Sequence, residues 1–348
     1  MPGEGFSEGK TGPPRLRIAD IAARTGLSTA TVSRAMNGKP RISAATRARV
    51  LAVLDEIGYV PSGLAASLRT GQTGQLALII DTPDDPTRLA AMQGAFHAAR
   101  QAKYGMAVYM IGDEGDRTRT YSQTLARGWV DGALLLWPGR ADAPFVRRLR
   151  AGGLPMVLIE PEEAVPGLPA VYADAYDDGW RSTRYLLDLG HRRIAACANP
   201  AGWGIEGQYL EGYRAALAAA GIAADPALGA AAGWSYEAGY GVATTWLRVP
   251  DPPTGLLFRV DMAALGAVAA ARDLGRVVPD DLSVIGGDDT QMTQWIKPAL
   301  TTLRERRSGL TRVACELLLD LVAGRPPPAE PLLVQTAVVV RQSTAPRA

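Results

Sequence analysis

Short apolar runs alternate with helical segments from Gln75 onward in this 348-residue chain, and this alternation restricts the fold more than any other feature. The runs are LALII, MAVYMI, GALLLW, MVLIE, RIAACA, GLLF and SVIGG. Between them, segments such as 87–103 and 208–220 are predicted helices. Strands that alternate with helices form parallel sheets with right-handed crossovers. The sequence therefore predicts an α/β fold with two doubly wound lobes that face one cleft.

The length and composition indicate more than one domain. The chain exceeds the roughly 250 to 300 residues at which a single hydrophobic core stops growing, so two or three domains are expected. Residues 1–14 are rich in glycine and proline, and we expect them to be disordered. The chain has no run of about 18 apolar residues and no apolar signal segment, which favours a cytoplasmic protein without a membrane partner. Cys197 and Cys315 lie far apart, so buried thiols are expected rather than a disulfide framework or a zinc site.

Positive charge is concentrated in one short part of the chain. Residues 15–71 contain nine basic and three acidic side chains and carry a net charge of +6, whereas the whole chain carries only +2. A basic module on a mildly acidic body is typical of a protein in which that module binds a polyanion. A solvated charged face would have the same composition, so charge alone leaves both interpretations open.

The same basic region has the pattern of a helix-turn-helix. Apolar residues of IADIAART recur at helical spacing, and this helix stops at Gly26. Ser28 is placed to cap a second helix over 29–36, because its hydroxyl can accept a free N–H of the first turn. A third helix follows in SAATRARVLAVLDEIGY, with Ser43 as its predicted N-cap. The predicted core of the three helices consists of Ile18, Ile21, Ala22, Val32, Met36, Val50, Leu51, Leu54 and Ile57.

The second helix carries small hydroxyl residues around one arginine. A helix in the DNA major groove needs such residues, since hydroxyls bond base edges or phosphates and arginine can bind guanine with two hydrogen bonds. We therefore expect Thr29, Ala30 and Arg34 to face base edges. A poor helix in some other small bundle is the alternative. The residues expected to hold phosphates or to cap the helix are Ser28, Thr31, Ser33 and Asn37.

The region IADIAARTGLSTATVSRAMNG, followed by ISAATRARVLAVLDEIGYVPSGLAASLRTG, resembles the N-terminal domain of the lactose-repressor (LacI/GalR) family of bacterial transcription regulators. In that family, the stretch that corresponds to PSGLAASLRTG is a hinge that becomes helical on DNA, and two hinges insert a leucine side by side into the minor groove. The resemblance implies that Leu68 is this leucine and that Ala65 and Ala66 let the hinges approach closely. An apolar wedge of this kind partly unstacks a base step and bends the duplex.

The resemblance continues through YLLDLGHRRIA, EGYRAALAAAGI, WSYEAGY, VPDDLSVIGGDD, PALTTLRE and VVVRQST. It implies a periplasmic-binding-protein-like core in which three strands cross between the lobes, near 172–174, 298–302 and 324–332. The implied order is a tail over 1–14, the helix-turn-helix domain over 15–60, a hinge over 61–74 and the core over 75–348. Within the core, lobe 1 is expected over about 75–172 and 301–324, and lobe 2 over about 173–298 and 330–344.

The carboxyl ends of the strands are expected to converge on a small-molecule effector in the cleft. The resemblance places Trp234 where the family has an aromatic residue that stacks on the effector. It places Asp288 where the family has an acid that binds ligand hydroxyls, and a carboxylate can accept two of them. It also implies that Thr82, Trp137 and Glu160 line the other lobe.

Two polar anchors of the family's effector site are replaced in this chain. Tyr209 stands where the family has an arginine, and Val260 stands where it has an asparagine. Tyrosine cannot supply the two parallel hydrogen bonds of an arginine fork. We expect a carbohydrate or a related metabolite as the effector, with Tyr209 and Val260 redefining the pocket. A less hydroxylated or more aromatic ligand, or no effector at all, remains the alternative.

Other motifs point to competing functions. GWGIEG has the spacing of a dinucleotide-binding loop, but residues intervene between it and the preceding strand, and no acidic residue follows at the usual distance. His97 and His191 are too isolated for a catalytic or zinc constellation, and structural hydrogen bonding is the expected role of such histidines. No catalytic residue, metal ion or cofactor is therefore expected. A sugar-binding transport protein with the same core is a further alternative, and residues 16–71 argue against it.

Together these features predict a homodimeric, sequence-specific DNA-binding transcription regulator, most often a repressor in the family that it resembles. Its expected partners are near-palindromic operator DNA and a small effector.

Overall fold

The computed structural model describes residues 18–36, 40, 42–57, 71–81, 86–110, 125, 128–139, 142–198, 204–231, 233–304 and 306–347. The chain divides into two compact units, Met1–Gly71 and Gln72–Ala348, which we call the N-terminal unit and the C-terminal unit. Each unit has its own cluster of buried apolar side chains.

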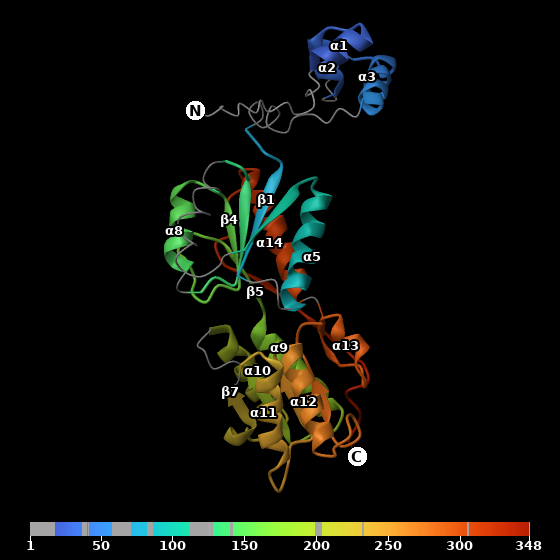
Figure 1. The fold of residues 1–348 in the computed structure, drawn as a ribbon. Helices are drawn as coiled ribbons and strands as arrows, with labels where there is room; N and C mark the ends of the chain where they lie inside the picture. The colour runs from blue at the N-terminus through green and yellow to red at the C-terminus, as the bar shows by residue number, and fades with distance from the viewer. Residues whose placement is uncertain are drawn as a thin grey trace, which may run out of the picture. The chain divides into compact units, whose positions relative to one another are not determined.

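The described part of the N-terminal unit consists of α1 (Ile18–Thr25), α2 (Thr29–Met36) and α3 (Ala44–Ile57) (Figure 1). Ser43 caps α3 as predicted, since its Oγ accepts a hydrogen bond from the N–H of Thr46 at 3.1 Å. The prediction that Leu51 joins the core is wrong, because its side chain is 46% exposed. Leu51 follows buried Val50 and so points about 100° away from it around the helix. The buried cluster consists of Ile21, Ala22, Val32, Ala35, Val50 and Leu54.

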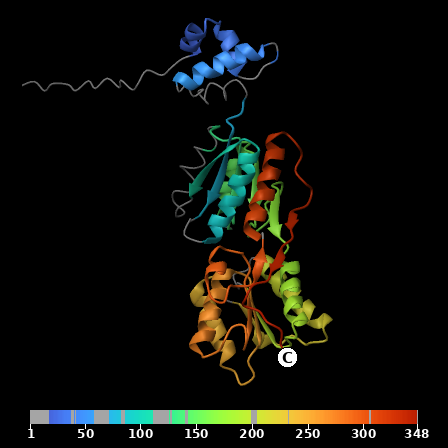
Figure 2. The ribbon, with the colours of Figure 1, turned by 90° about the vertical axis from the view of Figure 1, so that its right-hand side faces the viewer.

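Lobe 1 of the C-terminal unit is built on a six-stranded sheet in the order β11-β5-β4-β3-β1-β2. Every strand pair in it is parallel. Helices α5 (Pro86–Gln101) and α14 (Arg306–Val322) cover one face, and α8 (Ala143–Ala151) covers the other (Figures 1 and 2). The strands are β1 (Gln75–Ile80), β2 (Gly105–Met110), β3 (Gly132–Leu136), β4 (Met156–Ile159), β5 (Ala170–Ala173) and β11 (Leu332–Val334).

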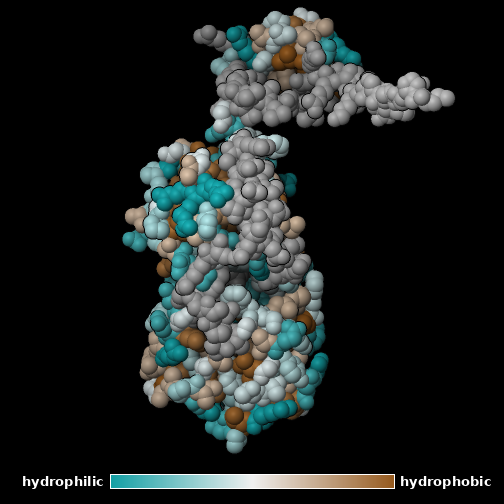
Figure 3. Space-filling view, turned by 60° about the vertical axis from the view of Figure 1, so that its left-hand side comes forward, coloured by the Kyte–Doolittle hydropathy of each residue, from teal (hydrophilic) through white to brown (hydrophobic). Residues whose placement is uncertain are grey.

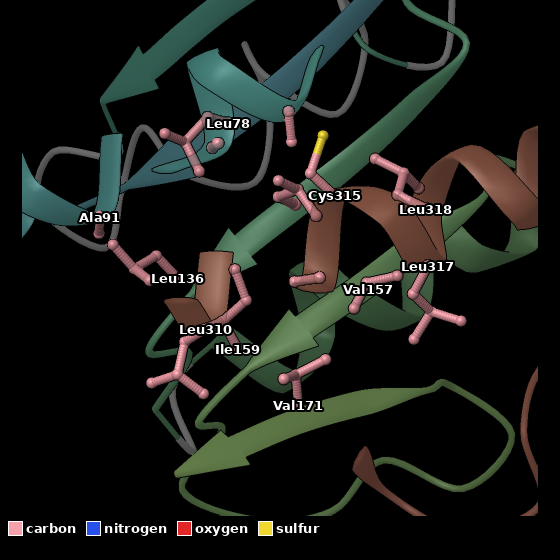
Figure 4. Packing of buried hydrophobic residues seen from close by; sticks show 14 of the residues in the cluster. Leu78, Ala91, Leu136, Val157, Ile159, Val171, Leu310, Cys315, Leu317 and Leu318 are labelled. Carbon is pink, nitrogen blue, oxygen red and sulfur yellow. The ribbon is translucent and has the colours of Figure 1, made fainter. Parts of the chain in front are cut away.

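The larger core of lobe 1 lies between the sheet and the pair α5 and α14. Leu78 and Val157 of the strands pack toward Leu310 and Cys315 of α14 (Figure 4). These two strand side chains are fully buried because both faces of a parallel sheet are covered by helices. Both cysteines of the chain are free and buried, as the sequence predicts.

Lobe 2 has a four-stranded parallel sheet in the order β7-β6-β8-β9. One face packs against α9 (Ala175–Asp188) and α10 (Gly204–Ala219), and the other against α11 (Tyr236–Leu247) and α12 (Asp261–Asp273). The strands are β6 (Ile194–Ala198), β7 (Gly229–Ala231), β8 (Gly255–Phe258) and β9 (Ser283–Ile285), and the short helices are the 3-10 turn Pro226–Leu228 and α13 (Met292–Trp295).

Two glycines let α9 and α10 of lobe 2 approach closely. A Cβ atom at Gly179 would lie 2.1 Å from the carbonyl oxygen of Tyr209, and one at Gly212 would lie 2.0 Å from that of Tyr176. Both distances are too short for a real contact, so only glycine fits at these positions. The close approach fixes Tyr209 against α9.

The chain passes between the lobes more than once. β5 of lobe 1 leads directly into α9 of lobe 2, while β10 (Thr302–Arg304) and β12 (Ala337–Val339) form an antiparallel pair. The third crossing was predicted near 324–332, and this is wrong, because β11 at Leu332–Val334 still pairs with β5 in lobe 1. The chain contacts lobe 2 just after β11, where the hydroxyl of Thr336 donates a hydrogen bond to Asp178 of α9. The polar and proline-rich sequence before β11 gives no apolar run from which this short edge strand could be predicted.

On the face shown in Figure 3, hydrophilic and hydrophobic residues are intermixed. None of the helices found among the described residues is long and apolar enough to cross a membrane.

Candidate functional site

The second helix of the N-terminal unit begins with a serine cap. The Oγ of Ser28 accepts a hydrogen bond from the backbone N–H of Thr31 at 3.1 Å and lies 2.9 Å from the Thr31 hydroxyl. The carbonyl of Ser28 accepts the first helical hydrogen bond, from Val32, at 2.9 Å. The cap that the sequence predicts is therefore formed, and it explains why serine precedes this short helix.

The outer face of α2 carries the side chains that were predicted to reach base edges. Thr29, Ala30 and Arg34 are exposed, whereas Val32 and Ala35 are buried against α1 and α3. This separation follows from helical periodicity, which sends the two sets to opposite sides. The arrangement presents an arginine and a threonine from a helix whose position is fixed by its buried face.

Some predicted site residues lie outside the described residues. They are Asn37 beyond α2, Ala65 and Leu68 in the predicted hinge, and Thr82 after β1.

In lobe 1, Trp137 and Glu160 directly follow the carboxyl ends of neighbouring strands β3 and β4. Both have left-handed backbones, with φ of 48° and 45°. Such conformations cost about 1 to 3 kcal/mol for a non-glycine residue and cluster at functional sites. The indole Nε1 of Trp137 donates a hydrogen bond to Oε2 of Glu160 at 3.0 Å. The structure therefore brings together two of the residues predicted to line lobe 1.

An arginine that the sequence did not single out covers the ring of Trp137. The Cζ of Arg88 lies 4.7 Å from the ring centroid, within the range of a cation–π contact. Arg88 also donates two hydrogen bonds to the carboxylate of Asp81, at 2.8 Å from Nε to Oδ1 and 2.6 Å from Nη2 to Oδ2. This bidentate pair holds the guanidinium over the indole.

A second unpredicted arginine joins the lobes. Arg259 directly follows β8 of lobe 2, and its Nη2 lies 3.7 Å from Oε1 of Glu160 in lobe 1. The side chains of Arg259 and Glu160 are only 1% and 4% exposed. The carboxyl ends of the strands of both lobes therefore meet at this ion pair. Trp137 and Glu160 were predicted from the resemblance to the family. Arg259 directly follows the apolar run GLLF, and this position at a strand end is the signal that could have found it.

In lobe 2, Asp261 is the centre of a buried hydrogen-bond network. Its carboxylate accepts hydrogen bonds from the backbone of Gly287 at 2.9 Å and of Thr290 at 2.7 Å, and from the hydroxyl of Thr302 at 2.6 Å. Burial, together with the nearby charge of Asp288, raises the pKa of Asp261 to about 6. The network ties the loop after β9 to the crossing strand β10.

Asp288, the predicted ligand-binding acid, is buried in the same loop. Its Oδ2 accepts a hydrogen bond from the backbone N–H of Asp261 at 3.2 Å and so takes part in capping α12. The neighbouring Asp289 has a left-handed backbone with φ of 51° and accepts a hydrogen bond from Nε of Arg304 at 3.2 Å. Asp289 also bonds to Arg341, which follows β12. The acidic loop therefore contacts two of the segments that cross between the lobes.

Three further residues of lobe 2 were predicted to contact the effector. Tyr209 is 1% exposed and packs with Ala175 and Ala198. Val260 is 6% exposed and belongs to the core between α11 and α12. Trp234 is 41% exposed and directly precedes Ser235, the N-cap of α11. Contact of these three residues with an effector stays a prediction.

His191 has the structural role that the sequence predicts. Its ring nitrogens lie 3.0 Å from the hydroxyl of Thr254 and 2.9 Å from that of Ser283. Burial, opposed by a hydrogen bond to Ala345, lowers the pKa of His191. This histidine holds the C-terminal segment against lobe 2.

Two family models match the chain. Residues 17–62 match the model of bacterial regulatory proteins of the lacI family, and residues 183–344 match a periplasmic binding protein-like domain. The first match contains the capped helix α2, and the second contains Arg259, Asp261 and Asp288.

Known repressors resemble the chain over nearly its full length. It is 32% identical over 333 residues to the HTH-type transcriptional repressor CytR of Escherichia coli (strain K12), with 94% of this chain and 96% of CytR covered. A solved transcriptional regulator CelR–cellobiose complex is similar with a TM-score of 0.68 and 29% identity, covering 94% of this chain and 100% of that one. A structure of the Lac repressor dimer bound to operator and the anti-inducer ONPF has a TM-score of 0.77 and 25% identity, covering 95% and 99%.

Proposed function

This chain belongs to the lacI family of bacterial regulatory proteins and is a DNA-binding transcription regulator, and we propose that it represses transcription by placing α2 in the major groove of an operator. The observation that carries this proposal is the exposed face of α2, where Thr29, Ala30 and Arg34 stand opposite the buried core. Ser28 and Thr31 cap the helix, and Ser33 and Asn37 are proposed phosphate contacts.

The proposed complex contains two copies of the chain on one near-palindromic site. The Lac repressor structure to which this chain is similar is a dimer bound to operator. A twofold protein binds two half-sites whose spacing is set by its symmetry. We propose that residues 61–74 are the hinge, that Ala65 lets two hinges approach, and that Leu68 wedges the centre of the site. The boundary between the two compact units, after Gly71, falls within this segment.

We further propose that a carbohydrate or related metabolite binds where the lobes meet and changes operator affinity. The relatives support this, since one similar structure is a complex with cellobiose. An effector acts on DNA binding only through different affinities for the two arrangements of the lobes. The network of Asp261 and Thr302 offers a route, because it joins the acidic loop after β9 to a crossing strand.

The same relatives support a regulator that performs no catalysis and works in the cytoplasm. The relatives reported above are transcription regulators. DNA regulation requires access to the chromosome, and the helices found among the described residues include none that could cross a membrane.

A mobility-shift experiment with genomic fragments from around the gene tests the DNA-binding proposal. The full-length chain is expected to retard a fragment at moderate salt, and Arg34→Ala is expected to weaken binding by roughly 1 to 3 kcal/mol and to relax preference at one position in each half-site. Arg49→Ala, which removes an exposed arginine from α3, is the matched control and should leave the sequence preference unchanged. Equal losses on operator and random DNA for Arg34→Ala would contradict its role at a base edge.

A metabolite panel read by thermal shift tests the effector proposal. A ligand that raises the melting temperature is then added to an operator titration, and binding is repeated with a Trp234→Ala, Asp288→Ala double variant. Unchanged ligand affinity in that variant would place the effector elsewhere. If no metabolite shifts the melting temperature of the parent, regulation without an effector becomes the better hypothesis.

A further inference from the structure

The first residues of the C-terminal unit are bound to one carboxylate of lobe 1. Oδ1 of Asp131 accepts hydrogen bonds from the backbone N–H of Thr73 at 2.7 Å and from its hydroxyl at 2.9 Å, and Oδ2 accepts one from the N–H of Gly74 at 2.8 Å. In the opposite direction, the N–H of Asp131 donates to the carbonyl of Gln75 at 2.8 Å. We call Asp131, Thr73 and Gly74 the entry clamp, since the chain enters lobe 1 at this point.

The entry clamp is also held from its other side. The N–H of Gly105, the first residue of β2, donates a hydrogen bond to the carbonyl of Gly74 at 2.9 Å. Hydrogen bonds to a carboxylate are charge-assisted and about twice as strong as bonds between neutral groups. Because Asp131 directly precedes β3, the clamp ties the start of β1 to both of the strands that flank it in the sheet.

The backbone around the entry clamp can rotate easily by itself. Gly71 and Gly74 have φ of 70° and 68°, in the left-handed region that glycine enters without the cost that a side chain brings. Glycines on both sides of Thr73 would let a free entry segment act as a pivot. The hydrogen bonds to Asp131 remove this freedom, so the chain leaves lobe 1 toward the predicted hinge in one fixed direction.

Two neighbouring strands join the entry clamp to the residues predicted to line the effector site. β1 and β3 pair in parallel register, and the clamp lies at their amino ends. At their carboxyl ends, Asp81 directly follows β1 and Trp137 directly follows β3, and Arg88 contacts both of these residues. All five side chains of β3 are buried, and a packed interior transmits strain instead of deforming. A movement of lobe 1 that starts at one edge of the sheet therefore reaches the clamp at the other edge.

We propose that Asp131 is a positioning residue for operator binding: by fixing Thr73 and Gly74, it makes the start of the linker part of lobe 1, so that the linker follows each reorientation of that lobe. This inference rests on the proposed function. A dimer on a near-palindromic operator has to present two DNA-binding units at one spacing. Fixing the start of each linker before binding lowers the entropy that is lost when both units bind together. The clamp therefore favours the paired site, and it contributes little to binding of random DNA, which depends on charge.

The test compares the full-length parent with variants of the entry clamp. Asp131→Ala removes the acceptor of all three hydrogen bonds. If this variant does not fold, two milder changes replace it: Thr73→Val removes only the hydroxyl donor, and Asp131→Asn places an amide group against the N–H of Gly74. Glu316→Ala is the matched control, because it removes a carboxylate of lobe 1 that is 53% exposed on α14.

Hydrogen exchange and DNA binding are measured on the same proteins. Amide exchange over residues 72–76 is expected to be faster in Asp131→Ala than in the parent, because two N–H groups lose their acceptor. Operator binding by Asp131→Ala is expected to weaken by about 10-fold, a fraction of the avidity that two linked modules gain. Binding to random DNA should change by less than about 2-fold, since the charge of the N-terminal unit is unchanged.

A metabolite that raises the melting temperature extends the test to regulation. In the parent it should change operator affinity by about 5- to 150-fold, and in Asp131→Ala by less than about 2-fold. The affinity of the protein for the metabolite, measured without DNA, should be the same in both, because Asp131 and Trp137 stand at opposite ends of β3. A merely structural role of Asp131 would lower the melting temperature without separating these two measurements.

Three results would overturn the inference. They are unchanged amide exchange over 72–76 in Asp131→Ala, operator binding by that variant as tight as by Glu316→Ala, and equal losses on operator and random DNA. Failure of the parent to bind any operator would reject the proposed function and the inference with it. A parent that binds operator but responds to no metabolite would reject only the effector regulation, and the operator affinities of the variants would still decide on the entry clamp.

Discussion

The two lobes present different kinds of polar groups to their common junction. In lobe 1, Trp137 and Glu160 bond to each other through their side chains, and both have left-handed backbones. In lobe 2, the carboxylate of Asp261 is occupied by backbone N–H groups of its own acidic loop and by Thr302 of a crossing strand. Arg259 of lobe 2 reaches across to Glu160 of lobe 1.

This difference assigns separate roles to the two lobes: one chooses the effector, and the other couples effector binding to the strands that join the lobes. Side chains that contact one another at strand ends can exchange those contacts for a ligand without loss of the fold. A buried carboxylate that holds a loop to a crossing strand cannot, because every donor that it releases stays buried. Lobe 1 is therefore suited to select the effector, and the network in lobe 2 is suited to couple the effector to the strands that join the lobes.

The largest effect is expected from breaking the ion pair between Glu160 of lobe 1 and Arg259 of lobe 2. Glu160→Gln leaves the charge of Arg259 buried without its carboxylate, and removing one partner of a buried pair costs about 3 to 5 kcal/mol in the free energy of unfolding. Chemical denaturation measures this loss. The double variant Arg259→Met/Glu160→Gln should recover most of it, and a double variant no more stable than Glu160→Gln would show that the two charges are not coupled.

A smaller loss is expected when the network of lobe 2 is removed. Asp261→Ala deletes the acceptor for the backbone of Gly287 and Thr290 and for the hydroxyl of Thr302, which should lower the free energy of unfolding by about 3 kcal/mol. Asp273→Ala, at the exposed end of the same helix, is the control and should change it by less than about 0.5 kcal/mol. If Asp261→Ala and Asp273→Ala had equal free energies of unfolding, the Asp261 network would not stabilise lobe 2, and the contrast drawn here between the lobes would be wrong.

The same carboxyl group makes the stability of lobe 2 depend on pH. Burial raises the pKa of Asp261 from 3.8 to about 6, so the folded state holds its proton more tightly than the unfolded state does. The stabilisation is therefore complete below about pH 4 and is lost as the pH rises through about 6. Between pH 7.5 and pH 5, the parent should gain about 1.5 kcal/mol relative to Asp261→Asn. Denaturation at a series of pH values measures the free energy of unfolding of both proteins. If this free energy changed with pH by the same amount in the parent and in Asp261→Asn, the account would be contradicted.

The smallest effect is expected from the side-chain bond in lobe 1. Trp137→Phe removes the hydrogen bond from Nε1 to Glu160 but keeps an aromatic ring under Arg88, so the free energy of unfolding should fall by about 1 kcal/mol. Trp295→Phe, at a tryptophan that is 67% exposed, is the matched control and should have no measurable effect. Indole fluorescence during denaturation reports both variants, and a loss well above that of Asp261→Ala would reverse the order assigned to the lobes.

How well the sequence predicts a feature of the structure depends on how far apart along the chain the contacting residues lie. Local patterns predict the cap at Ser28 and the apolar strands, because periodicity and capping depend on residues only a few positions apart. Residues 332–334 join β5, which lies far away in the sequence, so the prediction of the third crossing was wrong. Arg259 and Glu160 are almost a hundred positions apart, and only the folded chain shows that they meet.

The residues of the candidate site also divide into those that were predicted from the sequence and those that only the folded chain brings together. Trp137 and Glu160 were predicted from the resemblance to the family and bond to each other in the structure. Arg88 was missed, because its contact with Trp137 depends on how α5 is placed against the sheet. The central role of Asp261 was also missed, since its sequence neighbours carry no sign that Thr302 would reach it.

Titration of an operator fragment with the full-length chain, in the absence and presence of a metabolite that raises its melting temperature, tests the central claim most directly. The account predicts that the bound metabolite changes operator affinity by about 5- to 150-fold, the range of a typical allosteric coupling. It also predicts that the change is lost in Arg259→Met/Glu160→Gln, whereas Arg272→Met, at an arginine whose side chain is 78% exposed on α12, retains it. An operator affinity that stays the same in the parent when the metabolite is bound would contradict the claim that the junction of the lobes controls DNA binding.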